Sequence, residues 1–144
     1  ESGIDFEYYR DFTPSQGKLV EAMDKERMAI ADAFGIPVRT ALEEYCTMYP
    51  THGNNVYEAI HNCPGYDGIM GQKTLRTRYI LEDIPFALEA IKAMGQVAGV
   101  QTPCIDAVIT LARAIVDDVA EGRTAKNLGI DGMSKEEFLK LCIG

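Results

Sequence analysis

Apolar residues recur along much of this chain at the three- and four-residue spacing of amphipathic helices. The clearest case lies between Thr13 and Gly35, where Thr13 suits an N-cap, Pro14 suits the first helical position and Gly35 is a typical helix end. Four apolar residues of this stretch fall on one helical face: Leu19, Met23, Ile30 and Phe34. The pattern predicts a long amphipathic helix.

Further helices are predicted over 39–49, 54–62, 86–99, 102–122 and 134–142. Gly99 marks a helix end, and Ser134 with Glu137 has the order of a capping box. The stretch 102–122 carries a broad apolar stripe typical of a central core helix: Ile105, Val108, Ile109, Ala112, Ile115, Val116 and Val119.

No stretch alternates apolar and polar residues with the period of two that a half-buried strand needs. Short connections join the predicted helices. The sequence therefore predicts an all-α fold, a single helical bundle of about six to eight helices. With 144 residues, we expect one domain with one core over residues 1–144.

Composition and charge exclude several classes of function. The formal net charge of −8 argues against a nucleic-acid surface, and no run of about 18 apolar residues is present to span a membrane. The four cysteines stand far apart without a C-x-x-C pair, and His52 and His61 fit no metal-binding pattern. We expect no metal site, reduced thiols and a cytoplasmic location.

The chain contains no G-x-G-x-x-G after a predicted strand and no P-loop. A dinucleotide held by a Rossmann unit needs the glycine-rich turn between a strand and a helix. We therefore expect no cofactor-binding residue within this chain.

The stretch "RYILEDIP", residues 78–85, carries the candidate chemistry. Pro85 suits the first turn of a helix and disfavours a helical Ile84, which would place Glu82 and Asp83 just ahead of a helix start. One interpretation is structural: helix-start carboxylates, with Arg78 in a surface ion pair worth roughly 0–1 kcal/mol. In the other, Arg78 anchors an acidic substrate through its planar guanidinium, and Asp83 orients a histidine.

The residues around this stretch resemble a known family. "RYxxEDIP", together with "DFTPS" and "AMDKERMAIADAFGI" upstream, is similar to the C-terminal helical domain of the opine dehydrogenases, which include octopine and nopaline dehydrogenases. "AGVQTPCIDAVI" and "GRTAKNLGI" continue the likeness downstream. The resemblance implies a fold like the C-terminal domain of 6-phosphogluconate dehydrogenase.

The resemblance also implies a reaction. In that family a Rossmann domain binds NAD or NADP, the helical domain covers the substrate cleft, and an amino acid is joined to an α-keto acid by reductive condensation. Arg78 matches the family's arginine beside the substrate, and Asp83 matches the aspartate paired with the catalytic histidine. The implied partners are the two substrates and the chain's own Rossmann domain, with a homodimer as a further expectation.

The stretch "THGNNVYEAI" offers three further candidates. Asn54, Asn55 and Tyr57 can line a substrate cleft as substrate-binding residues. The alternative is an N-cap with a surface tyrosine, because asparagine strongly prefers helix caps.

One departure from the family pattern is important. The family's catalytic histidine lies in an "HP"-type segment before the stretch that begins this chain, and neither His52 nor His61 occupies that place. We therefore expect an excised domain that is inactive alone. Two alternatives stay open: a free-standing helical binding or dimerisation module, and the helical domain of a ketopantoate-reductase-like enzyme.

Overall fold

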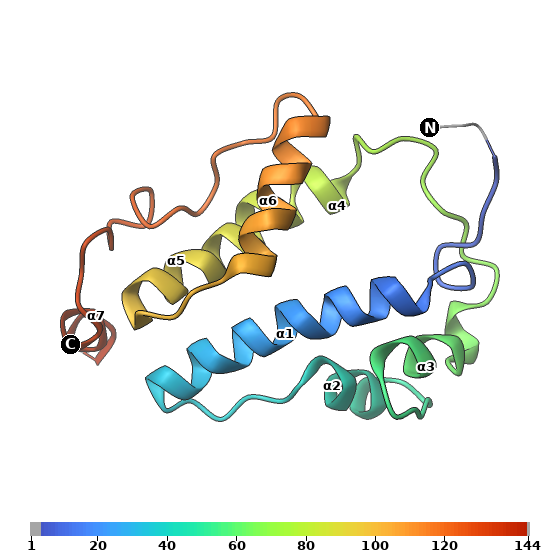
Figure 1. Cartoon of the computed structure of the whole chain (residues 1–144), viewed down its shortest axis with the longest axis horizontal. Coiled ribbons are helices and arrows are strands. Elements are labelled where there is room, and N and C mark those ends of the chain that lie inside the picture. Colours follow the sequence, from blue (N-terminus) through green and yellow to red (C-terminus); the bar gives the residue numbers. More distant parts are fainter. Residues whose placement is uncertain (1–3, 144) are drawn as a thin grey trace. The chain divides into compact units, whose positions relative to one another are not determined.

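A computed structural model describes residues 4–143 of the chain (Figure 1). The elements in chain order are α1 (Pro14–Phe34), α2 (Ala41–Met48), α3 (Val56–His61), the 3-10 turn η1 (Pro64–Tyr66), α4 (Arg78–Leu81), the π turn η2 (Ile84–Leu88), α5 (Glu89–Ala98), α6 (Pro103–Ile115) and α7 (Lys135–Ile143). Residues 4–143 contain no strand, only an isolated antiparallel bridge between Glu7 and Met70. The all-α prediction is confirmed.

The described residues form two compact units. The first contains the residues up to 28 together with 38–75, and the second contains 29–37 together with the residues from 76 onward. Helix α1 supplies residues to both units. The expectation of one domain over residues 1–144 stays a prediction.

An aromatic cluster organises the first unit. Tyr66 is buried with Val56, Ile60 and Cys63, and its ring stacks on that of Tyr9 with 3.9 Å between ring centroids. Desolvation by this burial raises the pKa of the Tyr66 hydroxyl above its ordinary value. The short helices α2 and α3 are thereby held by their apolar faces, since helices of 8 and 6 residues have little stability of their own.

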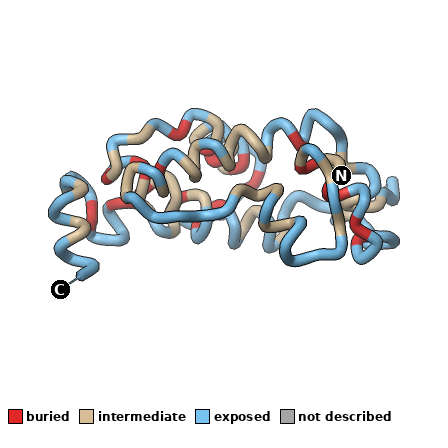
Figure 2. The backbone as a smooth tube through the Cα atoms, turned by 90° about the horizontal axis from the view of Figure 1, so that it is seen from below, coloured by how far each residue is buried: buried red, intermediate tan, exposed pale blue. Residues whose placement is uncertain are grey.

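The second unit has its own buried cluster, formed by Ala93, Val97, Ala125 and Ile130. Partly buried hydrophobic side chains pack against it: Phe34, Met94, Met133 and Phe138. Ile105 and Ile109 of α6 are also buried (1% and 4% exposed). Figure 2 shows such buried positions alternating with exposed ones along the helices, as amphipathic helices require.

Several predicted helix ends are confirmed. Gly99 ends α5 in the left-handed conformation (φ 70°). At the start of α7, the Ser134 backbone N–H donates to Glu137 Oε2 at 2.8 Å and the Glu137 N–H donates to Ser134 Oγ at 3.3 Å, as the capping box predicts.

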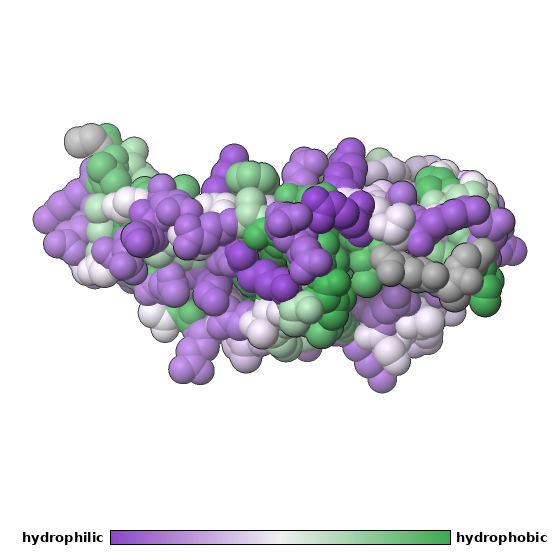
Figure 3. Space-filling model, turned by 90° about the horizontal axis from the view of Figure 1, so that it is seen from above, coloured by the Kyte–Doolittle hydropathy of each residue, from purple (hydrophilic) through white to green (hydrophobic). Residues whose placement is uncertain are grey.

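The prediction for α6 is wrong in two respects. The helix ends at Ile115 rather than running to residue 122, and Ile115 is 52% exposed rather than in the core. Leu111, one turn earlier, is 61% exposed, so α6 buries one face only. Figure 3 shows apolar side chains reaching the surface among hydrophilic ones. Arg113 binds the carbonyls of the segment that follows, and these hydrogen bonds hold that segment outside the helix.

No disulfide joins any of the four cysteines, Cys46, Cys63, Cys104 and Cys142, in the described part of the chain. None of the helices within residues 4–143 combines the length and apolar character that a bilayer crossing requires. In the same part of the chain, no group of three or more His, Cys, Asp or Glu side chains is arranged to hold a metal ion.

Candidate functional site

The "RYILEDIP" stretch forms an irregular helical segment that leads into α5. Helix α4 begins at Arg78, Glu82 follows with φ −113° and ψ −54°, and Asp83 is helical (φ −69°, ψ −35°). The π turn Ile84–Leu88 then continues into α5. The prediction that a helix starts at Pro85, with Ile84 outside it, is wrong, because helical structure begins at Arg78 and Ile84 lies in the π turn.

Pro85 explains why this segment is irregular. Proline has no backbone N–H, so it cannot make the bond to the carbonyl four residues earlier that a continuous α-helix needs. The chain widens by one residue instead, and the Glu89 N–H donates to the Ile84 carbonyl, five residues back. Ile84 and Pro85 are buried and anchor the turn. Such π turns are frequent at functional sites.

Arg78 and Asp83 are both exposed on this segment. The Arg78 guanidinium carbon lies 5.8 Å from the centroid of the Tyr79 ring, at the edge of the range for a cation–π contact. Within residues 4–143, no ion pair joins Arg78 to Glu82 or Asp83, so the surface ion pair of the structural interpretation is not formed there. Both predicted site residues are accessible to a ligand or to another part of the protein.

Asn54, Asn55 and Tyr57 lie in the other compact unit, at the start of α3. Asn55 is the N-cap: its Oδ1 accepts from the Glu58 N–H at 2.8 Å. The Asn54 backbone N–H donates to Glu58 Oε2 at 2.7 Å, and this bond is the main cause of a lowered pKa at Glu58. The capping interpretation is therefore realised, while a substrate-binding role for these residues stays a prediction.

Tyr57 is half-buried, and its ring lies against that of His61 with 4.3 Å between centroids. The His61 Nε2 is 2.8 Å from the Phe12 carbonyl oxygen, so this histidine is held by the backbone of its own unit. His52 is exposed in the loop before α3. Both histidines belong to the first unit, whereas Asp83 belongs to the second.

A partly buried ion pair near the site was missed by the sequence analysis. Arg113 Nη2 lies 2.9 Å from Glu89 Oε1, and the Glu89 side chain is only 8% exposed. The pair lines a pocket of about 310 Å³ between α5 and the segment after α6, together with other residues of the unit: Lys92, Ala93, Gln96, Glu121, Thr124 and Ala125. In the sequence, the glutamate flanked by apolar residues in "FALEAIKAM" could have indicated a buried carboxylate.

A dinucleotide cofactor does not fit the described chain. The glycine-rich phosphate loop of a Rossmann unit needs a strand before it, and residues 4–143 contain none. We therefore assign no cofactor-binding residue within them.

The sequence of this helical chain matches one family of enzymes. The family model described as "NAD/NADP octopine/nopaline dehydrogenase, alpha-helical domain" matches residues 1–116. Because this match covers most of the chain, the chain belongs to that family. The resemblance seen in the sequence is thereby confirmed.

Individual relatives agree with this assignment. An opine dehydrogenase from Arthrobacter sp. (strain 1C) is 41% identical over 137 residues, which are 93% of this chain and 38% of that protein. The protein ocs of Agrobacterium vitis is 28% identical over 95% of this chain and 39% of that protein. The chain thus spans less than two-fifths of the length of these relatives.

Solved structures show the same fold. Octopine dehydrogenase with NADH and L-arginine matches with a TM-score of 0.70 at 23% identity, over 85% of this chain and 38% of that one. Octopine dehydrogenase with NADH and pyruvate matches with a TM-score of 0.70 at 21% identity, over 91% and 38%. The helical fold of this chain is therefore similar to that of part of octopine dehydrogenase.

Proposed function

We propose that this chain is the substrate domain of an NAD(P)-dependent opine dehydrogenase, which joins an amino acid to an α-keto acid by reductive condensation. Membership of the family supports the class of enzyme. The solved relatives in complex with L-arginine and with pyruvate support the two kinds of substrate. The observation that carries the proposal is the exposure of Arg78 and Asp83 on the irregular segment before α5.

Arg78 binds a substrate carboxylate in this proposal. An amino acid and an α-keto acid each carry a carboxylate, and the planar guanidinium can bind one through two parallel hydrogen bonds. Within the described residues, its guanidinium has a contact with the Tyr79 ring and no carboxylate in an ion pair. The guanidinium of Arg78 is therefore available to a ligand.

Asp83 holds and orients a histidine that another part of the enzyme contributes. A carboxylate beside an imidazole favours its protonated form and selects its tautomer, which suits a residue that gives and takes protons during condensation and reduction. The exposed Asp83 carboxylate, which has no ion pair within residues 4–143, is available for this contact. Both the histidine and the site for NAD or NADP are proposed to lie in a second domain of the full-length enzyme.

The Arg78→Lys variant of the full-length enzyme tests the proposal. Lysine keeps the charge but cannot make the two parallel bonds, so the KM for one acidic substrate is expected to rise by about 10- to 100-fold, the range of one lost charge-assisted hydrogen bond. The measurement is steady-state consumption of NADH or NADPH with each substrate varied in turn.

Arg39→Lys provides the matched control, because Arg39 is also an exposed arginine and forms a surface ion pair with Glu44 at 3.7 Å. We expect no change in KM for this variant. If Arg78→Lys gives the same KM values as Arg39→Lys, Arg78 is not a substrate-binding residue.

A further inference from the structure

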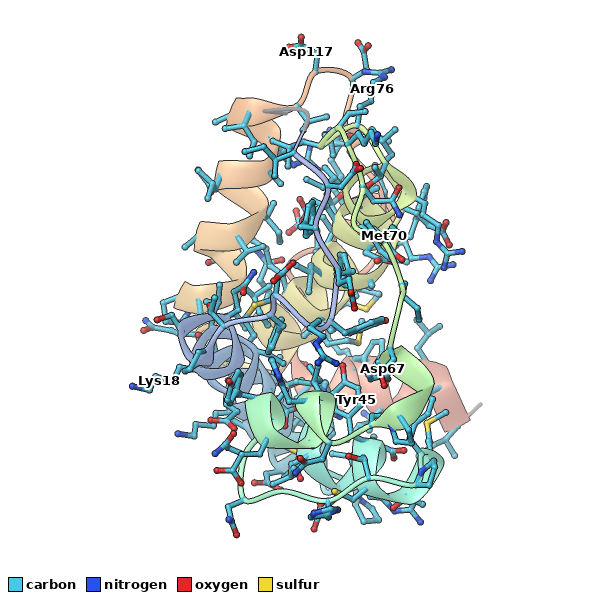
Figure 4. The ribbon with its side chains drawn as sticks, turned by 90° about the vertical axis from the view of Figure 1, so that its right-hand side faces the viewer. Lys18, Tyr45, Asp67, Met70, Arg76 and Asp117 are labelled. Carbon is cyan, nitrogen blue, oxygen red and sulfur yellow. The ribbon has the colours of Figure 1, made fainter. Side chains whose placement is uncertain are left out.

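Three arginines connect the segment after α6 to the candidate site by hydrogen bonds: Arg76, Arg113 and Arg123. We call residues 117–123 the strap. At its start, Arg76 Nη1 donates to the Asp117 carbonyl at 3.0 Å and lies 3.4 Å from Asp118 Oδ2. Figure 4 shows Arg76 and Asp117 near each other. Because Arg76 lies two residues before Arg78, this contact joins the strap to the beginning of α4.

The middle of the strap is held by Arg113. Its Nη2 donates to the carbonyls of Ala120 and Glu121, both at 3.0 Å, and to Glu89 Oε1 at 2.9 Å. Glu89 is the first residue of α5, and its backbone N–H closes the π turn on Ile84. One guanidinium thus joins the strap to the residue that completes the turn.

The end of the strap binds the π turn directly. In a regular α-helix the Glu89 N–H would bond to the Pro85 carbonyl, but here it bonds to Ile84. The Pro85 carbonyl is instead bonded by the Arg123 backbone N–H at 2.7 Å. Arg123 Nη1 also lies 3.3 Å from the Phe86 carbonyl oxygen. The strap therefore satisfies a carbonyl that the π turn leaves without its helical partner.

Gly122 is required for this approach. Its φ is +74°, a conformation that disfavours side chains, and a Cβ at this position would overlap the backbone of Pro85. Gly129 has a similar φ of +71°, but a Cβ there would meet nothing within 4 Å. The two glycines share a backbone conformation and differ in what lies beside them.

We infer that the strap, through Gly122 and Arg123, positions Asp83 by holding the π turn that begins at the next residue. This inference rests on the proposed function, which gives Asp83 its role. It goes beyond the family assignment, because the strap lies outside residues 1–116 that the family model matches. Gly122 and Arg123 are positioning residues in this scheme and do not contact substrate.

The first measurement is amide hydrogen exchange of the full-length enzyme, which does not depend on catalysis. In Gly122→Ala, peptides covering residues 84–89 are expected to exchange faster, because the methyl group pushes the strap away from Pro85. Gly129→Ala is the control for the strain of a positive φ, and its 84–89 peptides are expected to exchange at the wild-type rate. Equal exchange in the two variants would overturn the inference.

The second measurement is kinetic. Gly122→Ala is expected to lower kcat by about tenfold or more with little change in KM, since small misplacements of a catalytic group cost rate. Arg123→Ala is expected to act in the same direction, with Arg123→Lys recovering part of the loss by keeping a donor for Phe86. If the strap acts through Asp83, Gly122→Ala causes no further loss of kcat when Asp83 is already asparagine.

The outcomes separate the two hypotheses. If Asp83→Asn alone leaves kcat unchanged, the proposed role of Asp83 fails, and the positioning inference fails with it. If Asp83→Asn lowers kcat but Gly122→Ala does not, or if the two effects multiply, only the strap inference is overturned.

Discussion

Three glutamates, Glu43, Glu58 and Glu137, occupy the same third position of helices α2, α3 and α7. Each accepts a hydrogen bond from a backbone N–H at the helix start, and that bond is the main cause of its lowered pKa. A group with a lowered pKa in the folded state stabilises that state above its unfolded pKa and loses this contribution as the pH falls. These caps therefore weaken in acid.

The pH dependence of the α3 cap can be measured with Glu58→Gln. At neutral pH the wild-type enzyme is expected to protect the amides of residues 56–60 from exchange better than the variant. The difference is expected to shrink below the ordinary glutamate pKa of 4.5, because Glu58 becomes protonated there. The measurement is hydrogen exchange of both proteins at matched pH; a difference that persists unchanged in acid would contradict this account.

Asp83 can be tested against its neighbour. Asp83→Asn removes the charge that stabilises a protonated histidine, so kcat of the full-length enzyme is expected to fall by about 100-fold or more, with a smaller change in KM. Glu82→Gln removes a carboxylate from the adjacent exposed position and is expected to keep kcat near the wild-type value. Similar kcat values for the two variants, measured under saturating substrates, would argue against a catalytic Asp83.

Helices α5 and α6 show what local patterns predict and what they do not. The end of α5 at Gly99 follows from the residue itself, since glycine adopts the left-handed conformation without strain. Pro85 accounts for the interrupted α-helix, but the residues of the π turn do not predict that its carbonyl is bound by Arg123, far along the chain. The end of α6 was missed for a more local reason, because carbonyls seven and eight residues after Arg113 bind its side chain.

The two faces of α6 predict different costs of truncation. Ile109 is 4% exposed and Leu111 is 61% exposed. Ile109→Ala leaves a cavity and is expected to lower the free energy of unfolding by about 2–5 kcal/mol, whereas Leu111→Ala is expected to cost less than about 1 kcal/mol. Denaturant unfolding of both variants compares the two values. Equal losses would show that Leu111 is covered by another part of the protein.

At the scale of the whole molecule, the sequence predicted the helical fold and the family, but the roles of Arg78 and Asp83 stay predictions. The reason is physical: a substrate-binding arginine and a histidine-orienting aspartate are defined by the groups they face. The chain covers 38% of the Arthrobacter relative. We propose that the groups facing Arg78 and Asp83 belong to the rest of the enzyme.

The isolated 144-residue chain is expected to be inactive. Its described residues contain no strand to carry a dinucleotide loop, and both of its histidines belong to a different compact unit from Asp83. The measurement is oxidation of NADH or NADPH by the isolated chain with pairs of amino acids and α-keto acids, beside the full-length enzyme as the positive control. Turnover by the isolated chain would contradict the proposal that the catalytic histidine and the cofactor site lie in a second domain.

The hydrogen bonds between the strap and the π turn have a practical consequence for limited proteolysis. Trypsin cuts after arginine and lysine, but it needs several residues around the bond to leave the folded surface and extend into its cleft. Arg123 is tied to the π turn, whereas Lys126 lies exposed a few residues later. Scission after Arg123, compared with scission after Lys126, therefore reports how often the strap detaches in a native, working enzyme.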